Sequence, residues 1–220
     1  MALICVPLVE KTIEEDVSLA NSVDCDVVEA RLDYLKDSSG VDRLAGIKKP
    51  VIATCMPAWE GGRFSGSEEE RVLLLESCLP YCRYVSVELR MESKLRQLLV
   101  KKAKKAGVKV IIASHDFSKT PRPEAIVKLI REEKKAGADI AKVAFMAKRR
   151  EDVLALMQAL SAGKKIIPVI ALSMGEEGRI SRVLAPYFGS FLTFAAASNG
   201  KASAPGQLTI EEVKRFSGFW

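Results

Sequence analysis

The chain has 220 residues, of which 48% are hydrophobic and 28% are charged. This length closes one sizeable hydrophobic core and is too short for two enzyme-sized domains, so we expect a single domain over residues 1–220. The formal charge of +6 raises the question of an anionic partner, either a nucleic acid or a small acidic substrate.

Other classes of protein are excluded by features that the sequence lacks. Its uncharged runs are strand-sized, whereas a membrane span needs roughly 20 apolar residues, so we expect no membrane partner. No basic segment precedes the first apolar residues, so we expect no secretory signal and a cytoplasmic protein. The five cysteines are scattered without a CxxC motif, and His115 is the only histidine. We therefore predict buried free cysteines, with neither a disulfide scaffold nor a metal site.

Short apolar, β-branched runs recur at intervals of roughly 24 to 33 residues, about the size of one strand–helix unit. They predict strands at Leu3–Val9, Val27–Leu35, Val51–Met56, Tyr84–Leu89, Val108–Ser114, Ile140–Met146, Ile166–Ser173 and Phe191–Ala197. Amphipathic segments between them predict helices at Ile13–Ala20, Ser67–Leu79, Lys94–Ala106, Pro123–Ala136, Glu151–Ser161, Gly178–Tyr187 and Ile210–Phe216. Ser67 with Glu70 predicts a capping box, and Gly107, Gly137 and Gly163 are expected to end three helices.

The alternation of eight strands with helices predicts a parallel (β/α)8 barrel, the TIM barrel. A doubly wound open sheet is the alternative. Its nucleotide-binding form carries a glycine fingerprint after the first strand, where this chain has Pro7-Leu8-Val9-Glu10-Lys11. In a barrel, reactive groups come from the carboxyl ends of the strands, so chemistry is expected there.

The second predicted strand carries charged residues at every second position. Glu29, Arg31 and Asp33 share one face, because side chains alternate along a strand. Helices cover the outside of a parallel barrel, so these charges are expected to point inward. Two interpretations remain open: an internal Glu–Arg ion pair that fills the barrel, or the lining of a substrate cavity.

A turn with two glycines, Trp59-Glu60-Gly61-Gly62-Arg63, follows the third predicted strand. The glycines give the backbone freedom beside a carboxylate. Glu60 is therefore suited to orient an imidazole, as acids do in triad-like sites.

Paired lysines explain most of the positive charge. They precede predicted strands, where they complement the carboxyl ends of helix dipoles by about 0.3–1 kcal/mol each. The pairs are Lys48-Lys49, Lys101-Lys102, Lys104-Lys105, Lys134-Lys135 and Lys164-Lys165. No aromatic residues are interleaved with them, as base stacking requires, so we expect no nucleic-acid partner.

Two residues with catalytic potential belong to the fifth and sixth predicted strands. His115 directly follows Val108–Ser114, on the reactive rim, where a general acid/base role competes with a structural one. Lys142 is expected to face inward with Ile140 and Ala144. Desolvation and nearby cations then lower its pKa and expose an amine that attacks a ketone to form a Schiff base. The alternative is that its side chain extends to solvent at the strand end.

The C-terminal part of the chain offers groups for a small anion. Arg182 presents a planar fork for a carboxylate, and Ser203 and Gln207 add neutral polar contacts from a rim loop. A surface arginine and a flexible loop are the alternatives.

Together these pieces resemble type I 3-dehydroquinate dehydratase, the Schiff-base enzyme of the shikimate pathway, over nearly the whole chain. The resemblance rests on Glu29-Ala30-Arg31-Leu32-Asp33, Glu60-Gly61-Gly62, Ser114-His115-Asp116-Phe117 with Thr120-Pro121, Ala141-Lys142, Ser181-Arg182 with Phe188-Gly189-Ser190, and Ala202-Ser203-Ala204-Pro205-Gly206-Gln207.

The resemblance implies a carbon–oxygen lyase that converts 3-dehydroquinate to 3-dehydroshikimate by syn elimination of water, without a cofactor. It implies that Lys142 forms the imine, that His115 carries the proton and that Glu60 orients His115. The expected substrate-binding residues are Glu29, Arg31, Arg182, Ser203 and Gln207, with Met174 and Phe194 as apolar walls.

Two departures from the family pattern matter. Many members place an arginine four residues before the glutamate of the EGG element, whereas this chain has Met56. We expect Arg63 or water to take over that role. The chain also begins at the first strand, so the N-terminal hairpin of longer relatives is expected to be absent or reduced.

Two other functions remain as alternatives. A class I aldolase acting on a phosphorylated sugar uses the same barrel chemistry but needs a phosphate cradle after the seventh and eighth strands. A basic binding protein without catalysis leaves Lys142 and His115 unexplained. The sequence does not decide between a monomer and a homodimer.

Overall fold

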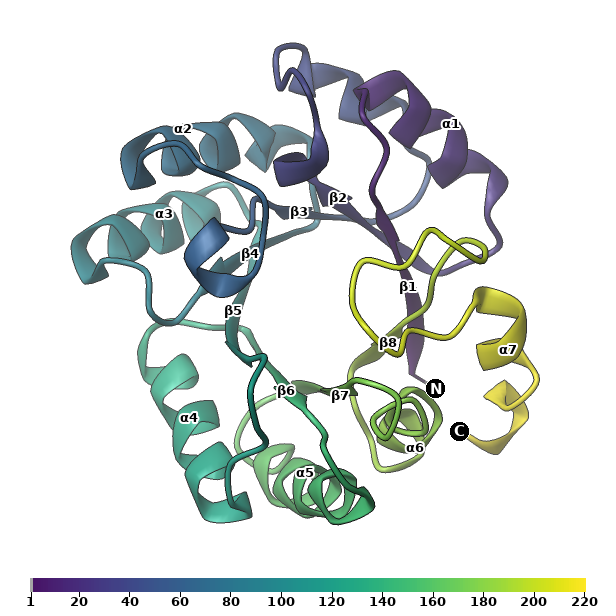
Figure 1. The fold of residues 1–220 in the computed structure, drawn as a ribbon. Helices are drawn as coiled ribbons and strands as arrows, with labels where there is room; N and C mark the ends of the chain where they lie inside the picture. Colours follow the sequence, from purple (N-terminus) through teal and green to yellow (C-terminus); the bar gives the residue numbers. More distant parts are fainter. Residues whose placement is uncertain (1) are drawn as a thin grey trace.

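A computed structural model describes residues 2–220, and eight parallel strands form its centre (Figure 1). The strands are β1 (Leu3–Leu8), β2 (Val27–Arg31), β3 (Val51–Thr54), β4 (Tyr84–Glu88), β5 (Lys109–Asp116), β6 (Ile140–Met146), β7 (Val169–Met174) and β8 (Leu192–Phe194). Each overlaps one of the predicted runs, so the prediction of eight strands is confirmed.

Helices surround the strands as an outer ring (Figure 1). They are α1 (Ile13–Ser22), α2 (Glu68–Cys78), α3 (Ser93–Lys105), α4 (Pro123–Lys135), α5 (Arg150–Gly163), α6 (Ser181–Tyr187) and α7 (Ile210–Lys214). The connection from β2 to β3 instead contains the short 3-10 helices Leu32–Tyr34 and Val41–Gly46.

The strand order shows that the sheet closes on itself. Neighbours follow the order β7-β6-β5-β4-β3-β2-β1-β8, and β1 pairs in parallel with both β2 and β8. At the seam between β7 and β8, the Phe191 N–H donates to the Val169 carbonyl over 2.7 Å. The predicted TIM barrel is confirmed, because a doubly wound sheet places no such bonds between its two edges.

Several predicted boundaries are wrong. The second strand stops at Arg31, because Leu32–Tyr34 turns into a 3-10 helix. His115 lies within β5 rather than after it, since that strand continues to Asp116. Gly163 does not end α5 in a left-handed conformation. It is the last helical residue, and a Cβ there would lie 2.5 Å from Ile130 Cδ1.

Other local predictions are confirmed. Ser67 and Glu70 form the capping box at the start of α2. Gly107 and Gly137 follow α3 and α4 with φ values of 74° and 104°, which only glycine adopts at low cost.

Lysines near the amino-terminal end of the barrel bind backbone carbonyls of neighbouring connections. The Nζ atoms of Lys49, Lys134 and Lys164 each donate over 2.8 Å, to the carbonyls of Ala20, Ile166 and Phe188 respectively. These contacts use positive charge to satisfy carbonyls that helix and loop ends leave free. These three of the paired lysines therefore serve the fold.

Apolar residues fill the inside of the barrel below the polar end. The interior cluster contains Cys5, Val27, Ile52, Ile111 and Ile140 among others, and a larger cluster lies between the strands and the helices. All five cysteines are free thiols; Cys25 and Cys82 are half-buried and the other three are buried. Within residues 2–220, no helix has the length and apolar composition needed to cross a bilayer.

Candidate active site

A cavity at the carboxyl ends of the strands collects most of the predicted site residues. Its lining is Glu29, Arg31, Thr54, Met56, Gly61, Ser86, Glu88, His115, Phe117, Lys142, Ala144, Leu172, Met174, Arg182, Phe194, Ser203, Ala204 and Gln207. The residues come from β2 through β8, from α6 and from the loop before α7. Barrel closure therefore brings together groups that are far apart in the sequence.

Lys142 lies inside the barrel, with its side chain 11% exposed. Its Nζ is 3.4 Å from Glu29 Oε1 and 4.4 Å from the centre of the Phe194 ring. Thr54 Oγ1 donates to the same Glu29 oxygen over 3.0 Å. The charged group in contact with the amine is thus a carboxylate, while the cations Arg31 and Arg182 line the same cavity. The amine faces the cavity and does not extend to solvent.

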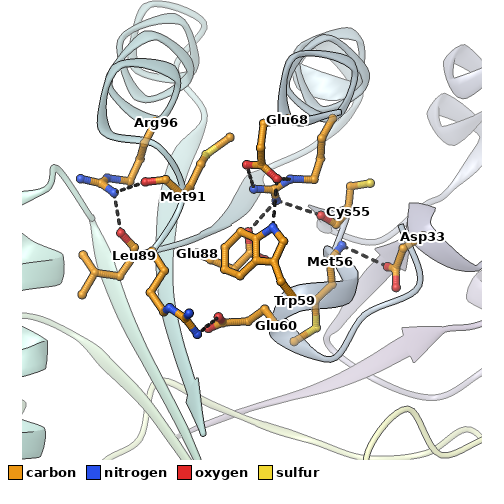
Figure 2. Close-up of polar contacts among 12 residues, drawn as sticks. Asp33, Cys55, Met56, Trp59, Glu60, Glu68, Glu88, Leu89, Met91 and Arg96 are labelled. Carbon is orange, nitrogen blue, oxygen red and sulfur yellow. Dashed lines mark hydrogen bonds and ion pairs between the residues drawn. The ribbon is translucent and has the colours of Figure 1, made fainter. Parts of the chain in front are cut away.

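Arg31 pairs with Asp33 rather than with Glu29, and both Glu29 and Arg31 line the cavity, so of the two interpretations the structure favours the cavity lining over an internal Glu–Arg pair. Its Nε and Nη2 donate to the two Asp33 oxygens over 2.9 and 2.8 Å. Asp33 lies in the 3-10 turn directly after β2, which places both of its carboxylate oxygens within reach of the guanidinium. Asp33 also accepts from the backbone N–H groups of Met56 and Arg63, so it joins β2 to the loop after β3 (Figure 2).

His115 and Glu60 lie against each other at the rim. The Glu60 Oε1 atom is 3.3 Å from His115 Nδ1 and accepts the His115 backbone N–H over 3.0 Å. Burial lowers the pKa of His115 below its ordinary value; the bond to Glu60 opposes that shift, and nearby Lys142 adds to it. The imidazole is therefore mainly neutral near pH 7, as a general base must be.

Glu60 lies behind His115 rather than in the lining of the main cavity. Its side chain is 1% exposed and borders a second hollow that Trp59 and Arg90 also line. Arg90 Nη1 is 3.7 Å from Glu60 Oε2. Figure 2 shows Glu60 beneath Trp59.

Arg182 is a buried cation that has no counter-ion among residues 2–220. It lies in the first turn of α6 and is 1% exposed, and its Nε and Nη2 have no hydrogen-bond partner among residues 2–220. Burial lowers its pKa to about 10. A desolvated guanidinium on a cavity wall is suited to an anionic ligand, because an unpaired buried charge is costly.

The loop before α7 supplies further polar groups. Gln207 Oε1 accepts the Ser203 backbone N–H over 2.8 Å, while Gln207 Nε2 is buried without a partner in the described chain. Lys201 ties this loop to Glu10 over 2.7 Å, and Figure 1 shows it passing over β1 and β8.

Met174 and Phe194 line the cavity as expected for apolar walls. Both are buried, with exposed fractions of 1% and 4%.

Arg63 does not line the cavity, so of the two expected replacements for the family arginine, Arg63 or water, the structure does not favour Arg63. It is exposed, and its guanidinium lies 3.9 Å above the centre of the Tyr34 ring. Asp33 holds its backbone N–H, so the glycine turn directs the side chain outward.

Sequence reasoning missed Ser86 and Glu88, which line the cavity from β4. They alternate in Tyr84–Leu89 as the charged residues do in the second strand, so the same two-residue period identifies them. Within residues 2–220, no group of three or more histidine, cysteine or acidic side chains is placed to hold a metal ion.

Known proteins are similar to this chain in sequence. The family described as Type I 3-dehydroquinase matches residues 4–218. The 3-dehydroquinate dehydratase of Methanocaldococcus jannaschii is 38% identical over 217 residues, which cover 96% of each chain.

Solved structures are similar in fold. The 3-dehydroquinate dehydratase of Geobacillus kaustophilus superposes with a TM-score of 0.91 at 30% identity, covering 99% of this chain and 90% of that one. The type I enzyme of Clostridium difficile, with covalent modified comenic acid, gives a TM-score of 0.88 at 32% identity over 98% and 90% of the two chains.

Proposed function

Because the chain belongs to the type I 3-dehydroquinase family, we propose that it dehydrates 3-dehydroquinate to 3-dehydroshikimate through a Schiff base on Lys142. The enzyme is a hydro-lyase, and its place is the shikimate pathway of aromatic amino acid biosynthesis. One observation carries the proposal: the Lys142 amine and the unpaired Arg182 guanidinium line the same cavity. That pair suits a substrate with both a ketone and a carboxylate.

The reaction begins at the ketone. Lys142 Nζ, once deprotonated, adds to the carbonyl carbon, and loss of water from the carbinolamine gives an iminium ion. The iminium draws electrons from the neighbouring C–H bond and makes it acidic. His115 removes that proton, and the electron pair forms an enamine.

Elimination follows from the enamine. The nitrogen lone pair re-forms the C=N bond, and the electron pair of the enamine C=C bond forms a new double bond to C1 as the C1–O bond breaks. His115 gives its proton to the departing oxygen, so that water leaves. Hydrolysis of the conjugated imine then releases the product and the amine. Glu60 keeps His115 in one orientation through Nδ1 and stabilises the imidazolium between the two proton transfers.

The remaining groups bind the substrate. Arg182 takes the carboxylate through its free Nε and Nη2, and Gln207 Nε2 with Ser203 adds neutral donors. Glu29 and Arg31 receive ring hydroxyls, and Met174 and Phe194 enclose the ring.

Borohydride reduction tests the proposal. With substrate or product present, reduction is expected to leave a covalent adduct on Lys142, identified by peptide mass spectrometry. Lys142→Met is expected to lose both adduct and turnover. His115→Ala is expected to retain part of the adduct while turnover falls by orders of magnitude, since it removes only the proton carrier. A label on another lysine, or no label, contradicts the proposal.

A class I aldolase finds less support here. The region after β7 and β8 presents Arg182 and Gln207 rather than a cradle of backbone amides for phosphate.

A further inference from the structure

The Glu88 carboxylate lines the cavity from β4 but has no role in the proposed reaction or in the substrate contacts given for it. Glu88 ends β4, its side chain is 2% exposed, and it lines the same cavity as Lys142. In the ladder, Glu88 is paired with Ala113, and Ala113 is paired with Lys142. Glu88 and Lys142 therefore lie in one row of the barrel with a small residue between them.

Arg71 holds this carboxylate from behind. Arg71 comes from α2 and its side chain is fully buried. Its Nη1 donates to Glu88 Oε2 over 2.5 Å and to the Cys55 carbonyl over 3.0 Å. Its Nε and Nη2 donate to the two oxygens of Glu68 over 3.1 and 2.7 Å. The guanidinium is thus held by Glu68, by the Cys55 carbonyl and by Glu88 itself, which fixes its position behind the cavity wall.

The surface end of this network is covered by Trp59. The indole N–H donates to Glu68 Oε1 over 3.3 Å, and the ring centre lies 5.9 Å from Arg71 Cζ. Figure 2 shows Glu68 above the Trp59 ring, with Cys55 and Glu88 to either side of it. Arg71 donates to Glu88 Oε2. Within residues 2–220, no other side chain forms a hydrogen bond with the Glu88 carboxylate.

We propose that Glu88 is a further substrate-binding residue that accepts a hydrogen bond from a ring hydroxyl, and that Arg71 is the positioning residue that holds it. The inference rests on the proposed function. Arg182, which receives the carboxylate, follows β7, and β3 and β4 lie on the other side of the eight-stranded ring. A ring bound between them turns its hydroxyls toward β2 to β4.

Electrostatics supports the pairing of Glu88 with Arg71. Burial raises the pKa of Glu88 to about 7, Arg71 opposes the shift, and Glu60 adds to it. Behind the cavity wall, the charged groups near Glu88 are Arg71 and Glu68 from α2 and Glu60 from the loop after β3, and Lys142 lies in the same row on the cavity side. Without Arg71, this buried carboxylate loses the guanidinium that opposes the upward shift of its pKa.

Steady-state kinetics of Glu88→Ala and Glu88→Gln tests the inference. A hydrogen bond to a charged group contributes enough that Glu88→Ala is expected to raise KM by about tenfold to a hundredfold. Glu88→Gln keeps an acceptor oxygen, so its KM is expected to lie between those of Glu88→Ala and the unmodified enzyme. Arg71 keeps both bonds to Glu68 in these variants, so they are expected to fold.

Asp16→Asn is the matched control. Asp16 is also a buried carboxyl whose pKa burial raises to about 7, but it lies in α1 and does not line the cavity. Its replacement is expected to leave KM unchanged. A KM for Glu88→Ala within twofold of the unmodified enzyme overturns the inference.

A double variant tests the role of Arg71. Arg71→Met is expected to raise KM as Glu88→Ala does. The KM of Glu88→Gln/Arg71→Met is expected to be no higher than that of Glu88→Gln, because a neutral amide needs no counter-ion. If the two substitutions raised KM independently, so that their effects on binding free energy added, the positioning role of Arg71 would be overturned.

Borohydride trapping separates this inference from the proposed function. Trapping on Lys142 at saturating product is expected in all variants. Its absence in the unmodified enzyme counts against the proposed function instead.

Discussion

The buried charges of the cavity are compensated in three different ways. Arg31 donates from Nε and Nη2 to the two oxygens of Asp33, and Lys142 has a single longer contact to Glu29. Arg182 has no counter-ion in the described chain. The protein therefore leaves one cation uncompensated where a ligand carboxylate is proposed to bind, and the ligand completes the charge balance.

This imbalance predicts that Arg182→Met stabilises the protein while it disables binding. Removing an unpaired buried charge is expected to raise the unfolding temperature by about 2–4 °C, which is roughly 1 kcal/mol for a chain of this size. Loss of the carboxylate partner is expected to lower kcat/KM by about a hundredfold or more. Thermal unfolding and steady-state kinetics measure the two effects.

Arg71→Met is the control, because that guanidinium is buried and fully paired. Its loss leaves Glu88 without a counter-ion and is expected to lower the unfolding temperature. An Arg182→Met variant that also unfolded at a lower temperature would show that Arg182 has a compensating partner in the folded protein.

The position of the loop between β8 and α7 depends on a close contact between its backbone and the end of β7. It carries Ser203 and Gln207, and its Pro205 carbonyl accepts the Gly175 N–H over 3.2 Å at the end of β7. Gly206 has φ +74°, and a Cβ there would lie 2.1 Å from the Gly175 carbonyl oxygen. Only glycine allows the loop to lie this near β7.

Gly206→Ala is expected to shift the loop away from β7 and raise KM by about tenfold or more, since small misplacements of binding groups are costly. Gly200→Ala is the matched control. Gly200 has φ +85° in the same loop, with no atom within 4 Å of an added Cβ. Both variants carry similar backbone strain, so equal KM values for the two would show that the close approach does not position the binding groups.

At the scale of the whole molecule, buried carboxyls set the pH dependence of stability. Asp16 is 1% exposed and accepts the Glu10 N–H over 3.2 Å, and burial raises its pKa from 3.8 to about 7. The folded protein therefore holds a proton that the unfolded chain releases above pH 3.8. This contribution to stability is complete below that pH and is lost as pH rises to about 7, by about 1.4 kcal/mol per pH unit.

Asp16→Asn removes the titrating group, so the unfolding temperature of the variant minus that of the unmodified protein is expected to increase from pH 5 to pH 7. Thermal unfolding across that range measures the difference. Asp37→Asn is the control, because Asp37 is exposed and its pKa is lowered by bonds from Ser39. A constant difference for Asp16→Asn would show that Asp16 is ionised throughout.

The sequence by itself determined the barrel and half of the residues that line the cavity. Strand alternation and helix periodicity are local properties, so the eight strand–helix units follow from them. The same alternation turned Glu29, Arg31 and Lys142 inward, because a barrel has only two faces. The order of short motifs was sufficient to indicate the family.

Only the tertiary structure decided which side chains meet. Lys142 contacts Glu29 across 113 positions of sequence, and Arg71 reaches Glu88 from a helix. Arg63 turns outward onto Tyr34, although it directly follows the two glycines of the turn. These outcomes depend on the stagger between neighbouring strands and on the path of each loop. Both are set by packing of the whole barrel, which no local pattern encodes.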